Sequence, residues 1–204
     1  MYWHRNPSWF DRLWPGYVWH RRTDEKVLYL TFDDGPIPGV TPWVLSVLAE
    51  YGAQATFFCV GDNIRKHPDV FAQVRAAGHA VGNHTFNHLN GWQTDLDTYL
   101  QNTARCQQYL GGPPRLFRPP HGRMTRRQAA TLRPDYQLVM WDMLSGDFDR
   151  RLPPQTCLRN TVGGARNGSI IVFHDSLKAR PNLEYALPRF VRHFAGQGYA
   201  FRGL

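Results

Sequence analysis

Cysteine is scarce in this sequence of 204 residues. Only Cys59, Cys106 and Cys157 occur, and no two of them form a C-x-x-C pair. Three isolated thiols cannot build the disulfide framework that is typical of a small secreted domain. Cys59 lies within the apolar residues 55–60, which favours a small buried side chain over a reactive one.

Long hydrophobic runs are also absent. No apolar stretch approaches the roughly 18 residues that a membrane-spanning helix needs. The aromatic residues 9–19 are interrupted by Asp11, Arg12 and Pro15, and no small-residue cleavage site follows them, so they do not resemble a signal peptide. These absences, together with the unpaired cysteines, predict a protein that is cytoplasmic or peripheral to a membrane.

Acidic residues are outnumbered by basic ones. Lys and Arg total 24 against 16 Asp and Glu, which gives a net charge of +8 and an isoelectric point near 9.8. This balance is compatible with a nucleic-acid partner, with an anionic envelope or membrane surface, or with ordinary solvation. The arginine pairs at 21–22, 126–127 and 150–151 are dispersed, and no nucleic-acid-binding module is evident. We therefore expect no nucleic-acid partner. Ordinary solvation is the first explanation of the basic surface, and contact with an anionic membrane or envelope surface is the second.

The composition itself is that of a folded domain, with 42% hydrophobic and 14% aromatic residues, enough for one sizeable core. From residue 27 onward, strand-like segments alternate with helical ones. Strands are expected over residues 27–32, 55–60, 79–82, 116–118, 137–141, 169–173 and 199–201. Helices are expected over residues 41–51, 68–77, 94–110, 125–132, 155–162 and 184–195. This alternation predicts an α/β domain with a parallel sheet, either open or closed into a barrel.

Polar residues gather directly after several of the predicted strands. These clusters are Asp33-Asp34, Asn83-His84, residues 118–121, Asp142 and His174-Asp175. In α/β folds the carboxyl ends of the parallel strands carry the functional site. The sequence therefore predicts that the chemistry of this protein lies at that edge of its sheet.

Two adjacent carboxylates, Asp33 and Asp34, end the first apolar strand. Their charges repel each other and desolvation adds to the cost, so a bound cation or a shared proton is expected to relieve them. The alternative is an acidic turn, because Asp-Gly-Pro at residues 34–36 is favourable turn chemistry.

His84 and His88 stand four residues apart, and on a helical turn this spacing places both imidazoles on one face. By itself the pair carries little weight, because nine histidines can produce such a spacing by chance. With Asp34 added, the three side chains form the donor set of a divalent transition-metal site that leaves positions open for water and substrate. Asp33 is then free to act as a base.

Two further charged groups follow later strands. Arg118 opens the segment Arg-Pro-Pro-His-Gly and is predicted to hold Asp33 ionised and oriented, unless it is an ordinary surface arginine. Asp147 and His174 are predicted to pair, so that the carboxylate raises the pKa of the imidazole and makes His174 a general acid. The alternative is a structural histidine at a strand end.

Taken together, these residues resemble the polysaccharide deacetylase family, the carbohydrate esterases of family 4 that share the NodB homology domain. Five stretches correspond in order to the motifs of that family: residues 31–36, 82–88, 118–122, 141–148 and 172–174. The resemblance implies Asp33 as the base and His174 as the acid, with Asp147 as partner of the acid and Arg118 as partner of the base. It implies a metal held by Asp34, His84 and His88.

The resemblance also implies a fold. It indicates a distorted, incomplete (β/α) barrel of mostly parallel strands for residues 26–204, the catalytic domain. Residues 1–25, which are rich in Trp and Arg, lie outside it. We expect this extension to pack on or beside the domain as an extra helix, with a position on a membrane interface as the alternative.

Three positions depart from the family pattern. His121 stands where an aromatic residue, often tyrosine, is usual, Leu144 replaces the first aspartate of the fourth motif, and Phe148 replaces its tryptophan. By resemblance, His121 and Phe148 line the substrate groove together with Trp141 and Val172. The departures therefore bear on the identity of the substrate.

The activity implied by the resemblance is metal-dependent removal of N-acetyl groups from a glycan that contains N-acetylglucosamine, of the chitin-oligosaccharide or peptidoglycan type. Asp33 would take a proton from the attacking water, His174 would protonate the departing amine, and a backbone N–H near His121 would face the oxyanion. Zn²⁺ is the expected metal, with Co²⁺, Mn²⁺ or Ni²⁺ as alternatives. Two other functions stay open: a metal-dependent amidase or O-acetyl esterase on a small substrate, and an inactive metal-binding module that binds glycans.

Overall fold

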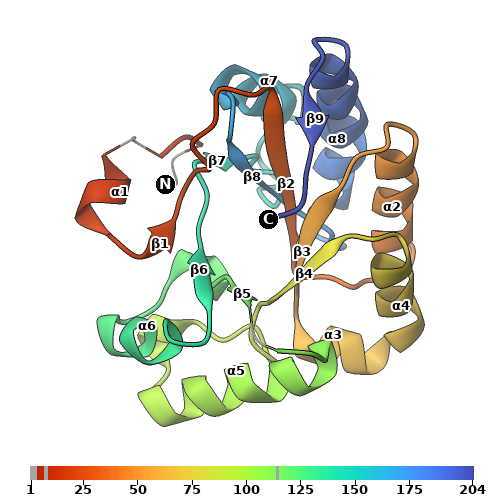
Figure 1. The fold of residues 1–204 in the computed structure, drawn as a ribbon. Helices are drawn as coiled ribbons and strands as arrows, with labels where there is room; N and C mark the ends of the chain where they lie inside the picture. The colour runs from red at the N-terminus through yellow and green to blue at the C-terminus, as the bar shows by residue number, and fades with distance from the viewer. Residues whose placement is uncertain (1–3, 7–8, 114) are drawn as a thin grey trace.

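The computed structural model describes residues 4–6, 9–113 and 115–204. At its centre is one curved sheet in the order β1-β6-β5-β4-β3-β2-β8-β7, with β9 also paired to β2 (Figure 1). The pairings between these strands are all parallel. The strands are β1 (Tyr17–Val18), β2 (Val27–Asp33), β3 (Ala55–Cys59), β4 (Ala80–Asn83), β5 (Leu116–Phe117), β6 (Gln137–Val139), β7 (Met143–Leu144), β8 (Ile170–His174) and β9 (Ala200–Phe201).

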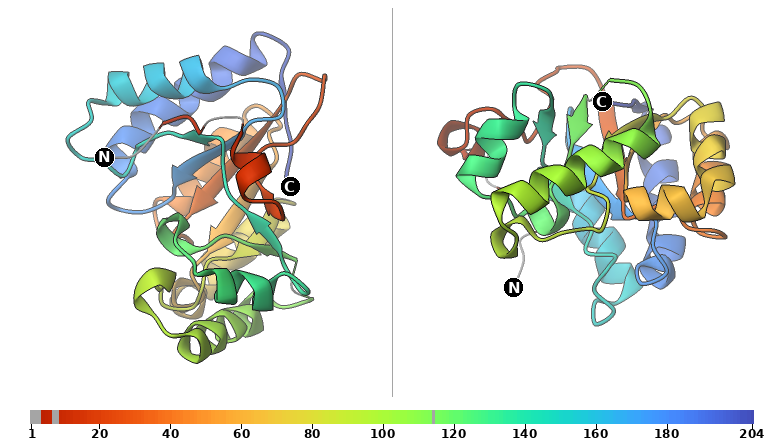
Figure 2. Two further views of the ribbon diagram at one scale, coloured as in Figure 1. Left: turned by 90° about the vertical axis from the view of Figure 1, so that its left-hand side faces the viewer. Right: turned by 90° about the horizontal axis from the view of Figure 1, so that it is seen from below.

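Helices lie around the outside of this sheet, as the view from below shows (Figure 2). They are α1 (Phe10–Leu13), α2 (Thr41–Ala49), α3 (Gly61–Lys66), α4 (Pro68–Ala76), α5 (Leu96–Leu110), α6 (Arg126–Leu132), α7 (Pro154–Gly164) and α8 (Arg180–Ala195). The short 3-10 turns η1 (Gly91–Gln93) and η2 (Pro120–Gly122) lie in the loops after β4 and β5. The architecture is the incomplete (β/α) barrel that the family resemblance implied.

Local sequence signals set several of the helix boundaries. Asp95 caps α5 by accepting the Thr98 N–H at 2.9 Å. Helix α8 begins at Arg180, ahead of the expected residue 184, because Pro181 is tolerated in a first turn where no N–H is needed. Helix α3 was not predicted, since six residues are too few to display a helical repeat of apolar positions.

A row of three phenylalanine rings packs the middle of the sheet. Phe32 on β2 stands in register with Phe57 on β3 and Phe173 on β8, and its ring centroid lies 5.0 and 6.1 Å from theirs. All three rings belong to the main hydrophobic core. Because side chains alternate along a strand, the neighbouring Asp33 points to the opposite side, into the barrel. The core therefore fixes where this carboxylate stands.

The described residues before β2 bridge the two edges of the sheet. β1 pairs with β6, whereas the His4 carbonyl accepts the Leu144 N–H of β7 at 2.7 Å. Near the start of β8, the Arg21 N–H donates to the Gly168 carbonyl at 2.9 Å. These bonds fasten the segment to both sides of the opening between β6 and the β7–β8 pair.

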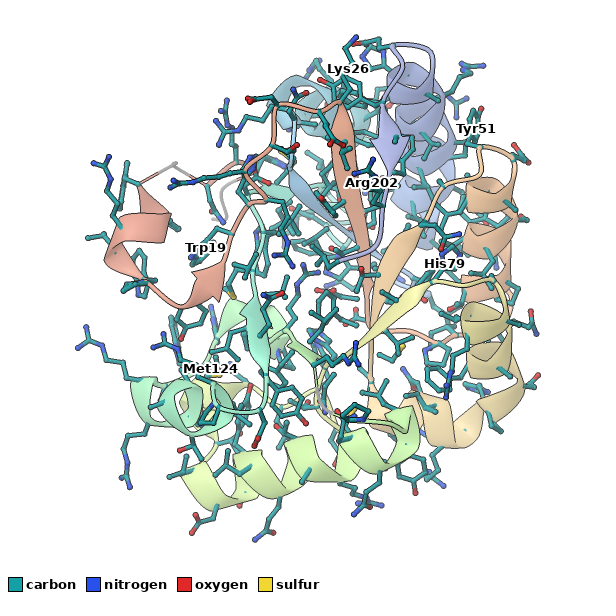
Figure 3. All side chains as sticks on the ribbon, in the orientation of Figure 1. Trp19, Lys26, Tyr51, His79, Met124 and Arg202 are labelled. Carbon is teal, nitrogen blue, oxygen red and sulfur yellow. The ribbon has the colours of Figure 1, made fainter. Side chains whose placement is uncertain are left out.

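The extra helix expected for residues 1–25 is largely absent from the described part of this segment. Helix α1 has four residues, and Pro15 and Gly16, the latter with φ of 90°, turn the chain away from a helical path toward β1. Trp19 anchors the segment with its buried ring, which lies beside β1 in Figure 3. Part of the expected helix falls on residues 1–3 and 7–8, which are outside the described residues. No helix in the described part of the chain is long and apolar enough to cross a membrane.

Candidate active site

The carboxyl ends of four strands bring the predicted site residues to one edge of the barrel. β2 ends at Asp33, which lies in register with His174 at the end of β8. β4 ends at Asn83, which is in register with Phe117 on β5, so the next residues, His84 and Arg118, also lie side by side. The predicted clustering of polar residues at this edge is therefore present for these residues. Asp142, which was predicted to join them, instead bonds Ser169 and Ile170 at the start of β8, away from this edge.

Asp34, His84 and His88 form a group whose ligand atoms lie within 4.8 Å of one another. The Oδ1 atom of Asp34 is 3.2 Å from Nε2 of His88 and 3.9 Å from Nε2 of His84. Nδ1 of His84 lies 2.7 Å from the Arg118 carbonyl, which accepts its hydrogen bond. Nε2 is then unprotonated, and its lone pair is available to a metal. Burial lowers the pKa of His84 to about 4, which keeps it in the neutral form that ligates a metal. One carboxylate and two imidazoles so arranged fit a divalent transition metal.

The loop that carries the two histidines is not a helical turn, and its backbone brings the imidazoles together by a different path. Thr85 and His88 have φ values of 61° and 55°, in the left-handed region that ordinary residues rarely adopt. Side chains hold this path: Asn83 Oδ1 accepts the Thr85 N–H at 2.9 Å, and Thr85 Oγ1 accepts the Leu89 N–H at 3.0 Å. Asp34, with φ of 82°, shares the same uncommon conformation. Two of the three residues of this group, Asp34 and His88, thus have uncommon backbone angles, as is frequent at functional sites.

Arg118 fixes Asp33 from inside the barrel. Its side chain is fully buried, and Nη1 donates to Asp33 Oδ1 and to Thr31 Oγ1, both at 2.7 Å. Nη2 and Nε donate to the Met140 and Val139 carbonyls at 2.9 and 3.3 Å. The second oxygen of Asp33, Oδ2, lies 4.0 Å from His84 Nε2, at the side of the metal-ligand group. The buried guanidinium therefore compensates the charge of Asp33 and leaves Oδ2 to face the site.

His174 and Asp147 form the predicted pair. The imidazole Nδ1 lies 2.7 Å from Asp147 Oδ1, and the His174 N–H donates to Oδ2 at 2.8 Å. Burial opposes a charge on the imidazole, but the buried carboxylate of Asp147 outweighs it, and the pKa of His174 is raised to about 9. The imidazole is therefore protonated near neutral pH, with Nε2 turned away from Asp147.

The four predicted groove residues differ in their exposure and in the side chains that they contact. His121 is exposed, and its ring centroid lies 4.6 Å from that of His88. Phe148 packs edge-to-face on His174 at 5.1 Å, and the Trp141 ring lies 5.8 Å from the Arg118 guanidinium carbon. Val172 is only 1% exposed, so it presents almost no surface to a ligand in this structure.

Asp175 is a further residue of the site that the sequence analysis noticed at a strand end but assigned no role. Its carboxylate is fully buried, accepting the Gly35 N–H at 2.9 Å and the Thr41 hydroxyl at 2.6 Å. Burial, aided by the charge of Asp34, raises the pKa of Asp175 to about 8. The carboxylate thus clamps the loop that follows β2. Only tertiary contacts reveal this role, because the residue has no distinctive spacing from Asp34.

Comparison with known proteins agrees with this geometry. The family model described as Polysaccharide deacetylase matches residues 20–137, more than half of the chain. The chain belongs to the polysaccharide deacetylase family. The resemblance inferred from the sequence motifs is confirmed.

Members of the polysaccharide deacetylase family match this chain over most of its length. A peptidoglycan-N-acetylglucosamine deacetylase of Bacillus cereus is 34% identical over 192 residues, which cover 91% of this chain and 90% of the relative. A chitooligosaccharide deacetylase of Azorhizobium caulinodans is 33% identical over 163 residues, covering 74% and 75% of the two chains. The crystal structure of the Bc1960 peptidoglycan N-acetylglucosamine deacetylase superposes with a TM-score of 0.88 at 26% identity, covering 98% of this chain and 95% of that one.

Proposed function

We propose that this chain is a metal-dependent hydrolase that removes N-acetyl groups from a glycan containing N-acetylglucosamine. The observation that carries the proposal is the presence, at one edge of the barrel, of a metal-ligand group, a carboxylate held by a buried arginine, and a His-Asp pair. The two relatives named for deacetylation of peptidoglycan and of chitooligosaccharides support the substrate class.

In the proposed mechanism, Asp33 is the base. A divalent metal held by Asp34, His84 and His88 supplies Lewis acidity toward the amide carbonyl and a more acidic water when it is bound. Asp33 accepts the proton of the attacking water through Oδ2, because Oδ1 is occupied by Arg118. The buried guanidinium compensates the charge of Asp33 and orients the carboxylate during the proton transfer.

His174 is the proposed acid. A departing amine needs a proton because an amine anion is too basic to leave, and Nε2 of the protonated imidazole can provide it. Asp147 holds the ring through Nδ1 and stabilises its charge. We assign the oxyanion to the backbone N–H near His121, and the acetyl methyl to the apolar ring of Phe148, which packs against His174.

Acetate release from metal-stripped protein tests the proposal. The substrates are N-acetylglucosamine oligomers, an aryl acetamide and an aryl acetate, each assayed with Zn²⁺, Co²⁺, Mn²⁺ or Ni²⁺ added back. Metal-restored release from the oligomers, with little from the aryl compounds, is the expected result. Release from the aryl compounds alone, by protein that demonstrably binds metal, would instead assign the site to a small-amide or ester hydrolase.

A further inference from the structure

Trp92 combines high exposure with a fixed position. Its side chain is 65% exposed, more than any other large apolar side chain of the described residues. Nevertheless, its indole Nε1 donates to the Met124 carbonyl at 3.2 Å, and its backbone N–H donates to Asn90 Oδ1 at 3.1 Å. A single exposed apolar residue needs no explanation, but an exposed ring held from two loops is preorganised to contact a ligand.

A cation supports the ring. The guanidinium carbon of Arg123 lies 5.0 Å from the centroid of the Trp92 ring, a cation–π contact. Arg123 is itself exposed and forms no ion pair within the described part of the chain. Together, the two side chains make an aromatic and basic surface, which we call the Trp92 platform.

The platform lies on the rim of the metal-ligand group. Trp92 follows His88 by four residues, so their Cα atoms are at most about 14 Å apart. On the other side, Arg123 follows His121, whose ring contacts that of His88 at 4.6 Å. Figure 3 shows Met124, whose carbonyl holds the indole, beside helix α6. The platform is therefore within reach of a neighbouring sugar when one residue of a glycan chain occupies the metal-ligand group.

The two loops that build the platform are joined by backbone contacts. The Gly91 N–H donates to the Arg123 carbonyl at 3.2 Å. A Cβ atom on Gly91 would come within 2.7 Å of that carbonyl oxygen and of Gln128 Oε1, so only glycine permits this approach. The amide of Gln128 also donates to the Gly91 carbonyl at 3.0 Å. The orientation of the indole is thus fixed by the fold rather than by a mobile loop.

We propose that Trp92 is a specificity-determining residue that stacks on a sugar ring adjoining the residue that loses its acetyl group. The inference rests on the proposed function and adds to it a contact with a second sugar of the glycan. The C–H groups on one face of a pyranose ring form an apolar surface, which complements the electron-rich face of an indole. Arg123 is the positioning residue that holds the indole in place.

The test is a comparison of chain lengths. kcat/KM for acetate release is measured with the N-acetylglucosamine monosaccharide and hexamer, for the wild type and for Trp92→Ala, Trp92→Phe and Trp14→Ala. Trp92→Ala is expected to lower kcat/KM for the hexamer about three- to tenfold, the size of one aromatic stacking contact, chiefly through KM. The monosaccharide, which has no adjoining ring, should be unaffected within about twofold, and Trp92→Phe should retain most of the hexamer activity. Trp14→Ala, which removes an exposed tryptophan from the N-terminal segment, should behave like the wild type.

Two results would overturn the proposal: equal losses for monosaccharide and hexamer in Trp92→Ala, or no loss for either. If the wild type releases acetate from neither compound, the proposed function fails and binding decides the role of Trp92. Calorimetric titration with the hexamer would then show weaker binding by Trp92→Ala than by Trp14→Ala if the platform binds sugar. Equal binding by the two variants would refute it.

Discussion

At the scale of single residues, Arg118 determines the charge balance of the site. It is the largest side chain that is fully buried, and its donors are satisfied by Asp33, Thr31 and two backbone carbonyls. Taking either partner away from such a pair leaves a charge in a place that water does not reach. The pair is therefore both a structural feature and a condition for the proposed base.

Replacing Arg118 with methionine is expected to lower the free energy of unfolding by about 3–5 kcal/mol, because Asp33 is left buried without its counter-charge. Adding Asp33→Asn should recover part of that loss, because the unpaired charge disappears. Urea denaturation of the two single variants and the double variant measures both effects. Simple additivity of the two losses would contradict the coupling.

The second prediction at this scale concerns the acid. His174 has its pKa raised to about 9, so activity should fall as the pH rises through that value and the imidazole loses its proton. Asp147→Asn removes the carboxylate charge, after which burial lowers the pKa of His174. The alkaline limb of the kcat/KM profile should therefore move to lower pH, with reduced activity at neutral pH. An unmoved alkaline limb would mean that another group carries it.

At the scale of elements, the loop after β2 is held in place by Asp175, the residue that follows β8. Asp175 clamps Gly35 and Thr41, and Asn63 on α3 donates to the Asp34 carbonyl at 2.7 Å. The loop that bears Asp33 and Asp34 is thus positioned by two other elements, one of which, α3, the sequence did not reveal.

The raised pKa of Asp175 predicts a dependence of stability on pH. In the unfolded chain this carboxyl titrates near pH 3.9, and in the folded protein near 8. The folded state therefore binds more protons than the unfolded state between these values. The stabilisation that comes from protonated Asp175 is lost as the pH rises from about 4 to 8. In Asp175→Asn, the side-chain amide can accept from Gly35 and donate to Thr41 at every pH, so the decline should be smaller. Urea unfolding of metal-free protein across this range measures it, with exposed Asp135→Asn as the control. An unchanged slope in Asp175→Asn would contradict the assignment.

The elements also show how far the sequence could lead. The grouping of Asp34, His84 and His88 and the contact of Asp33 with Arg118 were predictable because Asp33-Asp34, His84 and His88 occur in a recognisable order at strand ends. The backbone path of the histidine loop was not predictable, because side-chain hydrogen bonds at Thr85 impose a left-handed conformation that spacing does not encode. The hydrogen bonds of Asp175 and the fixed indole of Trp92 depend on contacts between distant segments, so no local sequence pattern predicts them.

At the scale of the whole molecule, the N-terminal segment joins the two edges of the sheet through Asp142. Its carboxylate receives Ser169 Oγ at 3.0 Å and the Ile170 N–H at 2.9 Å, and its Oδ2 lies 2.9 Å from His20 Nδ1. One buried carboxylate thus ties the segment before β2 to the start of β8.

Asp142→Ala is expected to cost about 2–3 kcal/mol of stability, because the buried Ile170 N–H and Ser169 hydroxyl lose their acceptor. Amide hydrogen exchange at residues 17–21 should accelerate more than exchange in the phenylalanine row of β2, β3 and β8. Asp24→Ala, an exposed substitution nearby, provides the control. Uniform acceleration throughout the sheet, with no preference for residues 17–21, would count against a local tie.

The most direct test of the central claim is a zinc titration of metal-stripped protein, in which bound metal and acetate release from an N-acetylglucosamine oligomer are recorded together. The account predicts that release by the wild type saturates at one metal per chain. Asp33→Asn should bind the same single metal yet release acetate about 10²–10⁴-fold more slowly, because it lacks the base. Full activity of the metal-stripped protein, or of zinc-loaded Asp33→Asn, would contradict the assignment of this site.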